Sequence, residues 1–276
     1  VTAQAAIPIS ARMGLPPKPW PTGQCEELEP LVRRVLAPNP SPYTYTGTQS
    51  FIVGAGEGCA VIDPGPDLPD HVDALMAAIG EEKVLAILCT HTHRDHSPAA
   101  IPLAEATGAP VMGCAKLVIA DNGPRADEAF DTTYEPKRVL EDGEAVSGDG
   151  WTLRAVATPG HTSNHLCFAL EETGALFTGD HVMGWSTSVI VPPDGDMGDY
   201  MRSLDKIQCW KFDTLWATHG EQVGGREFVD HFITETAHHR RAREAAILDQ
   251  LRAGQSSIPE MVKVMYAEVD KRLHPA

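Results

Sequence analysis

The chain has 276 residues, of which 42% are hydrophobic and 22% charged, the balance of an ordinary globular protein. Its 38 acidic and 22 basic residues give a formal net charge of −16, which repels polyanions and counts against a general nucleic-acid binder. No apolar run approaches the length of a membrane span, so we expect no membrane association.

Three regions follow one another along the chain. Residues 1–42 hold nine of the 22 prolines and predict a Pro-rich N-terminal arm that is extended and only partly regular. Residues 43–224 carry the strands and the candidate site, and residues 225–276 are helical in pattern. In chain order the patterns predict strands 43–53 and 59–63, a helix 68–79, a strand 84–89, a helix 98–107, strands 151–157, 166–170 and 175–177, a helix 200–210, a strand 213–217, and helices 226–251 and 256–269. Two β-rich halves, each followed by helices, indicate two packed sheets with helices outside.

The segment after the 84–89 strand is the most informative part of the sequence. His91, His93, Asp95 and His96 fall within six residues, and each side chain can bind a divalent metal. Ser97 and Pro98 follow and predict the N-cap and first turn of the next helix. The cluster therefore lies at the carboxyl end of a strand, where open sheets tend to carry their chemistry.

Three more candidate ligands, His161, Asp180 and His219, each end a predicted strand beside a glycine. Strand ends of one packed pair of sheets can converge, and seven ligands suffice for two metals. Imidazole and carboxylate together suit zinc, and also iron or manganese. Asp180 has two carboxylate oxygens with which to bridge two ions.

A single histidine at a strand end is more often a hydrogen-bonded structural residue than a ligand. For the whole cluster that explanation is weak, because four polar groups in a row cannot all be buried without partners. Asp63, His165 and His181 lie beside the candidate ligands or at a strand end, and we expect them to hydrogen-bond the ligands. Trp185, Ser186 and Thr187 follow Asp180 and are candidates for substrate contact; a packed loop is the equally good alternative.

The sequence resembles the metallo-β-lactamase superfamily. His91-Thr92-His93-Arg94-Asp95-His96 is similar to its metal signature, and the later motifs Thr158-Pro159-Gly160-His161-Thr162, Thr178-Gly179-Asp180 and Thr218-His219-Gly220 follow in order. The resemblance spans about residues 43–224 and implies an α+β fold, a four-layer αββα sandwich with a binuclear site at one edge. It also implies that His91, His93 and His161 hold one metal, that Asp95, His96 and His219 hold the other, and that Asp180 bridges them.

Within the superfamily the likeness is greatest to the lactamase-β-like subfamily with a winged-helix tail, which includes an endoribonuclease. The stretches that carry it are Gly179–Gly184, Asp199–Leu204 and His238–Glu244. Pro98-Ala99 stands where the subfamily usually has Gly-Gly, and the C-terminal region corresponds to only the first part of a winged-helix module. We therefore expect a C-terminal helical appendage of incomplete winged-helix type.

These features predict a metal-dependent hydrolase, with two zinc ions and a metal-bridging hydroxide as nucleophile, and with Asp95 and Asp180 as catalytic residues. The substrate is an RNA phosphodiester or an ester or thioester, and the oligomeric state is open. The alternatives are a glyoxalase II-like thioester hydrolase and a mononuclear-iron persulfide dioxygenase; the full ligand set favours the two-metal hydrolase. Six scattered cysteines without a Cys-x-x-Cys pair predict reduced thiols and a cytoplasmic protein.

Overall fold

A computed structural model of the chain describes residues 20–118 and 130–267. The chain divides into two compact units, Val1–Asp230 and His231–Ala276. The first unit carries both β-sheets and all the candidate site residues.

The first sheet is built from the N-terminal part of the chain, and its strands lie side by side in sequence order. In the described residues they are β1 (Cys25–Glu29), β2 (Val32–Leu36), β3 (Gln49–Val53), β4 (Gly58–Ile62), β5 (Lys83–Cys89), β6 (Val111–Gly113) and β7 (Arg138–Val139). The strands from β1 to β4 pair antiparallel, and those from β4 to β7 pair parallel. The parallel pairing places the carboxyl ends of β4 and β5 at one edge of the sheet.

The second sheet has the spatial order β13-β12-β11-β10-β9-β8. Its strands are β8 (Ala145–Gly148), β9 (Trp151–Ala157), β10 (Leu166–Leu170), β11 (Ala175–Gly179), β12 (Thr214–Ala217) and β13 (Val223–Gly224). Among these described strands only β11 and β12 pair parallel, so their carboxyl ends also share an edge.

The helices of the described residues are α1 (Pro69–Ile79), α2 (Ala100–Thr107), α3 (Met197–Trp210), α4 (Arg226–Arg252) and α5 (Ile258–Met265). Helix α1 has proline in its first turn and ends at Gly80, whose φ of 62° is in the left-handed region that glycine tolerates. Helix α3 begins at Asp196, whose side chain accepts a hydrogen bond from the Asp199 backbone.

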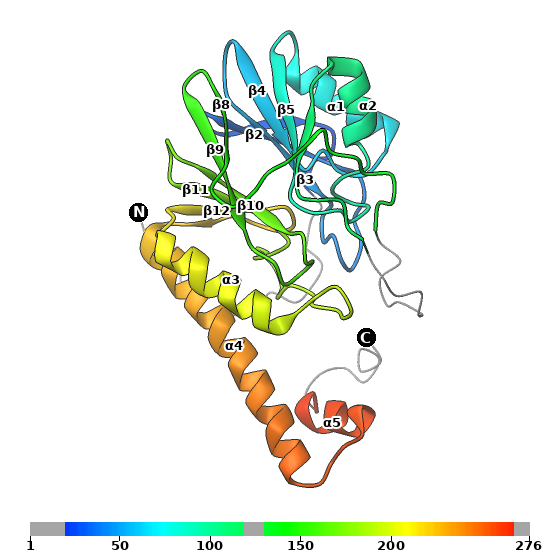
Figure 1. Ribbon diagram of the computed structural model, residues 1–276, viewed down its shortest axis with the longest axis vertical. Coiled ribbons are helices and arrows are strands. Elements are labelled where there is room, and N and C mark those ends of the chain that lie inside the picture. Colours follow the sequence, from blue (N-terminus) through cyan, green and yellow to red (C-terminus); the bar gives the residue numbers. More distant parts are fainter. Residues whose placement is uncertain (1–19, 119–129, 268–276) are drawn as a thin grey trace. The chain divides into compact units, whose positions relative to one another are not determined.

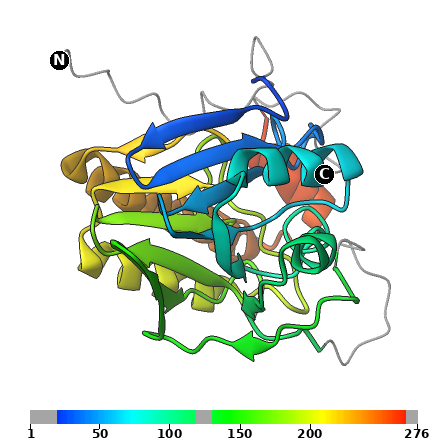
Figure 2. The same ribbon diagram turned by 90° about the horizontal axis from the view of Figure 1, so that it is seen from above.

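The two sheets pack face to face, with α1 and α2 outside the first and α3 outside the second (Figures 1 and 2). Phe51 of β3 lies across from Phe177 of β11, with ring centroids 5.0 Å apart. The indole of Trp151 is buried and donates from Nε1 to the Gly58 carbonyl at 3.0 Å. The molecule therefore has the α+β, four-layer αββα sandwich expected from the sequence.

One local expectation was incomplete and another is wrong. The described part of the arm predicted over residues 1–42 is extended and partly regular, but it also contains β1 and β2, whose hairpin extends the first sheet; residues 1–19 lie outside the described residues. Ser97 does not cap α2: the N-cap is Ala99, and the Ser97 hydroxyl instead donates to Asp131 Oδ2 at 2.7 Å. The helix begins two residues later than the capping rule predicts, and the Ser97 hydroxyl makes a charge-assisted hydrogen bond instead.

In the C-terminal unit the structure shows the continuation of α4 and the shorter α5. The Arg243 guanidinium lies 3.8 Å from the centroid of the Tyr266 ring, a cation–π contact within this unit. The predicted helix over 256–269 is present as Ile258–Met265, and residues 268–276, where the winged-helix expectation ends, lie outside the described residues. Over residues 20–118 and 130–267, no helix has the length and apolar character needed to cross a membrane.

Candidate metal centre

The parallel strands bring the candidate ligands together. His91, His93, Asp95 and His96 follow β5, whereas His161, Asp180 and His219 follow β9, β11 and β12 respectively. Backbone hydrogen bonds join the two sheets at this edge: Leu166 N donates to Thr90 O at 2.8 Å, and Gln49 N donates to Thr218 O at 2.9 Å. All seven ligands are therefore carried by loops that leave one edge of the sandwich.

One group of ligand atoms comes from His91, His93, His161 and Asp180, and its members all lie within 4.8 Å of one another. His93 Nδ1 is 2.9 Å from His91 Nε2 and 3.0 Å from His161 Nε2. His161 Nε2 is 3.5 Å from Asp180 Oδ2. Three imidazole nitrogens and a carboxylate oxygen around one point are a donor set for a tetrahedral metal.

A second group comes from Asp95, His96 and His219, also within 4.8 Å. Asp95 Oδ2 is 3.1 Å from His219 Nε2 and 3.6 Å from His96 Nε2. Asp180 Oδ1 is 3.5 Å from both of these nitrogens. Asp180 thus presents one oxygen to each group and connects the two.

Two buried atoms of the centre fit a cation. His96 Nε2 and Asp180 Oδ1 are both buried, and neither has a hydrogen-bond partner among the described residues. Leaving a buried nitrogen or oxygen unsatisfied costs about 1–3 kcal/mol. A divalent cation between these donors would satisfy both, so the residues present fit the metal that the donor types indicate.

In two ligand histidines, the ring nitrogen that faces away from the centre makes a hydrogen bond that orients the ring. His161 Nδ1 donates to Val189 O at 2.6 Å, and His219 Nδ1 donates to Gly47 O at 3.2 Å. Because a carbonyl can only accept, both rings carry a proton on Nδ1 and turn Nε2, the nitrogen that would bind metal, toward the centre.

Asp63, at the carboxyl end of β4, is fully buried and organises the second group. Its carboxylate accepts from His96 Nδ1 at 2.8 Å, from Thr90 N and Oγ1 at 2.8 Å each, and from Thr218 Oγ1 at 3.0 Å. The contacts come from loops of both sheets. Asp63 therefore fixes His96 with Nε2 facing Asp95 and Asp180.

His165 is the corresponding support for Asp180. Its Nε2 accepts from the Asp180 backbone N–H at 3.2 Å, so the proton lies on Nδ1, which donates to Thr158 Oγ1 at 2.9 Å. Gly179, with φ of 51°, leaves room for this contact, since a Cβ there would lie 2.7 Å from His165 Nε2.

His181 does not support the ligands as the sequence suggested. Its buried ring makes no hydrogen bond to any of the seven, and it packs instead on the Tyr200 ring of α3 at 4.9 Å between centroids. The tight turn after β11 sends Asp180 to the centre and the next side chain toward the helix layer.

The two groups differ in charge. Burial and neighbouring histidines hold the pKa of His91 well below its usual value, and burial with His161 lowers the pKa of His93 to about 3. Burial also disfavours a charged His96, but Asp95 and Asp180 outweigh it and hold its pKa well above the usual value. Without metal, His91 and His93 are neutral and ready to bind, whereas protons balance the carboxylates of the second group. A cation at the second group displaces protons.

The predicted substrate-contact residues lie beside the centre. The Trp185 ring stacks on Tyr45, with centroids 4.7 Å apart and 14° between the planes. Ser186 Oγ turns into its own loop and donates to Thr187 O at 3.4 Å. The sequence reasoning missed Tyr45, which has no motif, and Thr90, whose position directly before His91 was a usable signal.

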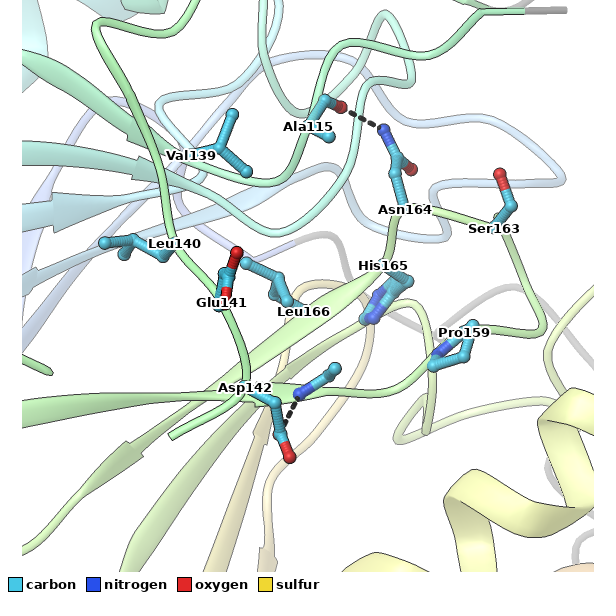
Figure 3. A pocket seen from close by; sticks show the side chains of 11 residues that line it. Ala115, Val139, Leu140, Glu141, Asp142, Pro159, Ser163, Asn164, His165 and Leu166 are labelled. Atoms are coloured by element: carbon cyan, nitrogen blue, oxygen red, sulfur yellow. Dashed lines mark hydrogen bonds between the residues drawn. The ribbon is translucent and has the colours of Figure 1, made fainter. Parts of the chain in front are cut away.

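A separate cavity of about 300 Å³ is lined in part by Pro159, Ser163 and Asn164 of the loop after β9 (Figure 3). Leu140, Glu141 and Asn164 are among the residues lining it, and none of the seven ligands is. Asn164 closes one side by donating to Ala115 O at 2.7 Å (Figure 3). The cavity shares His165 with the metal centre, but no ligand side chain lines it.

Comparison with known proteins agrees with this geometry. The sequence model described as "Metallo-beta-lactamase superfamily" matches residues 43–215, more than half of the chain. A lactamase-like protein of Pestalotiopsis microspora is 31% identical over 240 residues, which cover 86% of this chain and 67% of that protein. The atrochrysone carboxyl ACP thioesterase AgnL7 of Paecilomyces divaricatus is 30% identical over 262 residues, which cover 91% and 76%. A solved metallo-beta-lactamase family protein of Thermus thermophilus has the same fold, with a TM-score of 0.67 at 24% identity over 87% of this chain and 89% of that one. The chain therefore belongs to the metallo-beta-lactamase superfamily and is a metallo-hydrolase.

Proposed function

We propose that the chain holds two zinc ions at the metal centre and hydrolyses thioesters. The observation that carries the proposal is the division of seven ligands into two groups joined by the two oxygens of Asp180. Imidazoles, two of them held neutral by burial, together with a carboxylate favour zinc in the first group. The carboxylate-rich second group suits a second zinc, with iron or manganese as the alternatives to be tested.

When bound, metal ions at these two groups would lower the pKa of a water toward about 7 and polarise a carbonyl oxygen. The overall reaction would add water across the thioester, breaking the C–S bond and giving a carboxylic acid and a thiol. Asp180 fixes the distance between the two groups. Asp95 is the most open carboxylate of the centre, with a side chain that is 25% exposed. Burial alone would raise the pKa of Asp95, but His96 and His219 outweigh it and hold the pKa below its usual value, so Asp95 stays an ionised ligand.

Two observations favour a thioester over RNA. The relative AgnL7, similar over 91% of this chain, is named a thioesterase. The net charge of −16 repels a polyanion, and in RNA binding the phosphate contacts dominate affinity. We therefore propose a small-molecule or carrier-bound acyl thioester as substrate, in the cytoplasm, where unpaired cysteines stay reduced.

The persulfide dioxygenase alternative needs a single iron. Asp95, His96 and His219 form a complete second group, which a mononuclear enzyme does not require. One iron per chain with oxygen consumption on a persulfide would favour that alternative.

The test combines metal analysis with a substrate panel. We expect about two zinc ions per chain after zinc loading, hydrolysis of acyl thioesters, and no cleavage of an RNA oligonucleotide. His93→Ala and Asp180→Ala should reduce bound metal and abolish hydrolysis, whereas the exposed-surface variant Asp249→Asn should change neither. Full activity in either centre variant would reject the site, and cleavage of RNA but not of thioesters would reject the substrate.

A further inference from the structure

Two aromatic side chains from distant parts of the sequence form a stacked pair at one end of the metal centre. Tyr45 lies between β2 and β3, and Trp185 lies in the loop between β11 and α3. Their ring centroids are 4.7 Å apart and their planes are 14° from parallel. Both residues are partly exposed, so the pair is a surface of the site and not part of the core.

The loops that carry the two rings are both hydrogen-bonded to the metal ligand His219. Two residues after Tyr45, the Gly47 carbonyl accepts from His219 Nδ1 at 3.2 Å. One residue before Trp185, the Gly184 N–H donates to the His219 carbonyl at 3.1 Å. The aromatic pair therefore lies next to His219, at the end of the centre that the second group forms.

The backbone around the pair is constrained. Tyr45 has a φ of 58°, a left-handed conformation that is uncommon for a bulky residue and that concentrates at binding sites. Gly220, with a φ of 91°, lies against Trp185 so closely that a Cβ there would be 3.0 Å from the Trp185 Cβ. One unfavourable backbone conformation, at Tyr45, and one position that only glycine fits, at Gly220, thus lie where the two rings stack.

The chemistry of this surface indicates its ligand. Each ring covers one face of the other, and stacked aromatic faces favour a further planar, apolar group. Burial and the carboxylate of Glu221 raise the pKa of the Tyr45 hydroxyl, and the same carboxylate would repel an anionic ligand. At the other end of the centre, Val189 is 46% exposed, and its carbonyl holds His161. An uncharged apolar group therefore suits the Tyr45 end of the centre better than an anion does.

We propose that Tyr45 and Trp185 bind the acyl side of the substrate and select thioesters with a planar aromatic acyl group. The inference rests on the proposed thioester hydrolysis and adds the part of the substrate that this end of the site selects. Trp185 was predicted from its position after Asp180; Tyr45 and the acyl class come from the stacked geometry.

The kinetic test compares two substrates with the same thiol, benzoyl-N-acetylcysteamine and acetyl-N-acetylcysteamine. We expect Tyr45→Asn, which tolerates the positive φ, and Trp185→Leu each to lower the benzoyl-to-acetyl ratio of kcat/KM by roughly tenfold. Tyr45→Phe and Trp185→Phe keep an aromatic ring and should hold the ratio within about threefold of the wild type. Bound metal and thermal stability, measured on each variant, show that the fold and the centre are intact. An unchanged ratio in both ring-deleting variants would overturn the inference.

A binding test separates this inference from the proposed function. The non-hydrolysable S-benzyl-N-acetylcysteamine is titrated into metal-loaded protein, and its Kd is measured by calorimetry. We expect the Kd to rise roughly tenfold in Trp185→Leu and to stay unchanged in the exposed-surface variant His238→Asn. If no thioester is hydrolysed but this difference is seen, the reaction assignment fails and the aromatic site stands. If thioesters are hydrolysed but the Kd is the same in both variants, the aromatic site fails and the reaction stands.

Discussion

Replacing Asp63 by asparagine tests how the centre is organised, because the change removes a charge and keeps the shape. The two carboxylate oxygens accept from four donors: the backbone and hydroxyl of Thr90, Nδ1 of His96, and the hydroxyl of Thr218. An asparagine side chain offers one oxygen that accepts and one NH₂ group that can only donate. The hydroxyls can rotate to accept, but the Thr90 N–H cannot.

Whichever way the amide is placed, a conflict results. If its oxygen faces Thr90 N, its NH₂ faces His96 Nδ1 and forces the proton of that ring onto Nε2, the atom that would bind metal. If its oxygen faces His96, two donors face each other at Thr90. One charge-assisted hydrogen bond is lost in either case, so we expect the metal-free protein to lose about 2–3 kcal/mol of stability. Loss of a carboxylate partner of a metal-binding histidine weakens metal affinity by roughly 10–100-fold.

The assay is a competition titration of zinc against a chromophoric chelator, together with thermal melts of the metal-free protein. We expect the affinity of the second metal to fall more than that of the first. Asp63 bonds His96 directly, whereas it reaches the first group only through the Thr90 hydroxyl, which lies 3.0 Å from His91 Nδ1. Asp131→Asn is the matched control: Asp131 is also a buried carboxylate, bonded to Ser97, and its side chain bonds none of the seven ligands among the described residues. A folded Asp63→Asn variant that binds both metals as the wild type does would refute the reasoning.

Three further predictions concern other parts of the first unit. Chelating the metals should lower the Tm, because a ligand at 100 times its Kd contributes about 2.7 kcal/mol, or roughly 5–10 °C for a domain of this size; equal melts with and without chelator would contradict bound metal. His165→Gln should raise the Kd of zinc about tenfold by releasing the Asp180 backbone, and unchanged zinc titrations would show that this contact is dispensable. Burial lowers the pKa of His71 to about 4, so the unfolded chain takes up this proton at higher pH than the folded one, and stability falls as pH drops from 6.5 to 4. The pKa difference between 6.5 and about 4 corresponds to about 3 kcal/mol of unfolding free energy. In urea unfolding, His71→Gln should therefore lose about 3 kcal/mol less stability than the wild type as the pH falls. If both proteins show the same pH dependence, other groups cause the loss.

The strands and helices that the sequence predicted are those with strong patterns. β3 and β4 are buried throughout and rich in β-branched residues, and α1 is bounded by Pro69 and Gly80. The hairpin of β1 and β2 was missed because β1 is acidic and largely exposed, so it shows no apolar alternation. Strands β7 and β13 have two residues each, too few for any periodicity.

The site was predictable where it depends on local spacing. A histidine pair two residues apart, as at His91 and His93, can face one point whatever the rest of the fold does. The contacts that depend on packing of the two sheets were not predictable: Asp63 and Thr218 are 155 residues apart, and Tyr45 reaches Trp185 from a segment without a motif. The prediction for Ser97 failed for the same reason. It rested on a local capping rule, whereas the hydroxyl donates to Asp131, 34 residues away in the sequence.

The metal ligands and the aromatic pair lie on different loops, which explains why the reaction type is easier to infer than the substrate. The ligands follow strands whose positions are fixed by hydrogen bonds to their neighbours, and Asp63 and His165 lock two of them through contacts within the sandwich. The aromatic pair lies on connecting loops, where side chains can change without disturbing a strand. A substitution at Trp185 should therefore alter which acyl group is accepted while metal binding persists, whereas a substitution at Asp63 should weaken metal binding for every substrate alike. Measuring zinc affinity and acyl preference on the same two variants would reveal whether the two properties separate in this way.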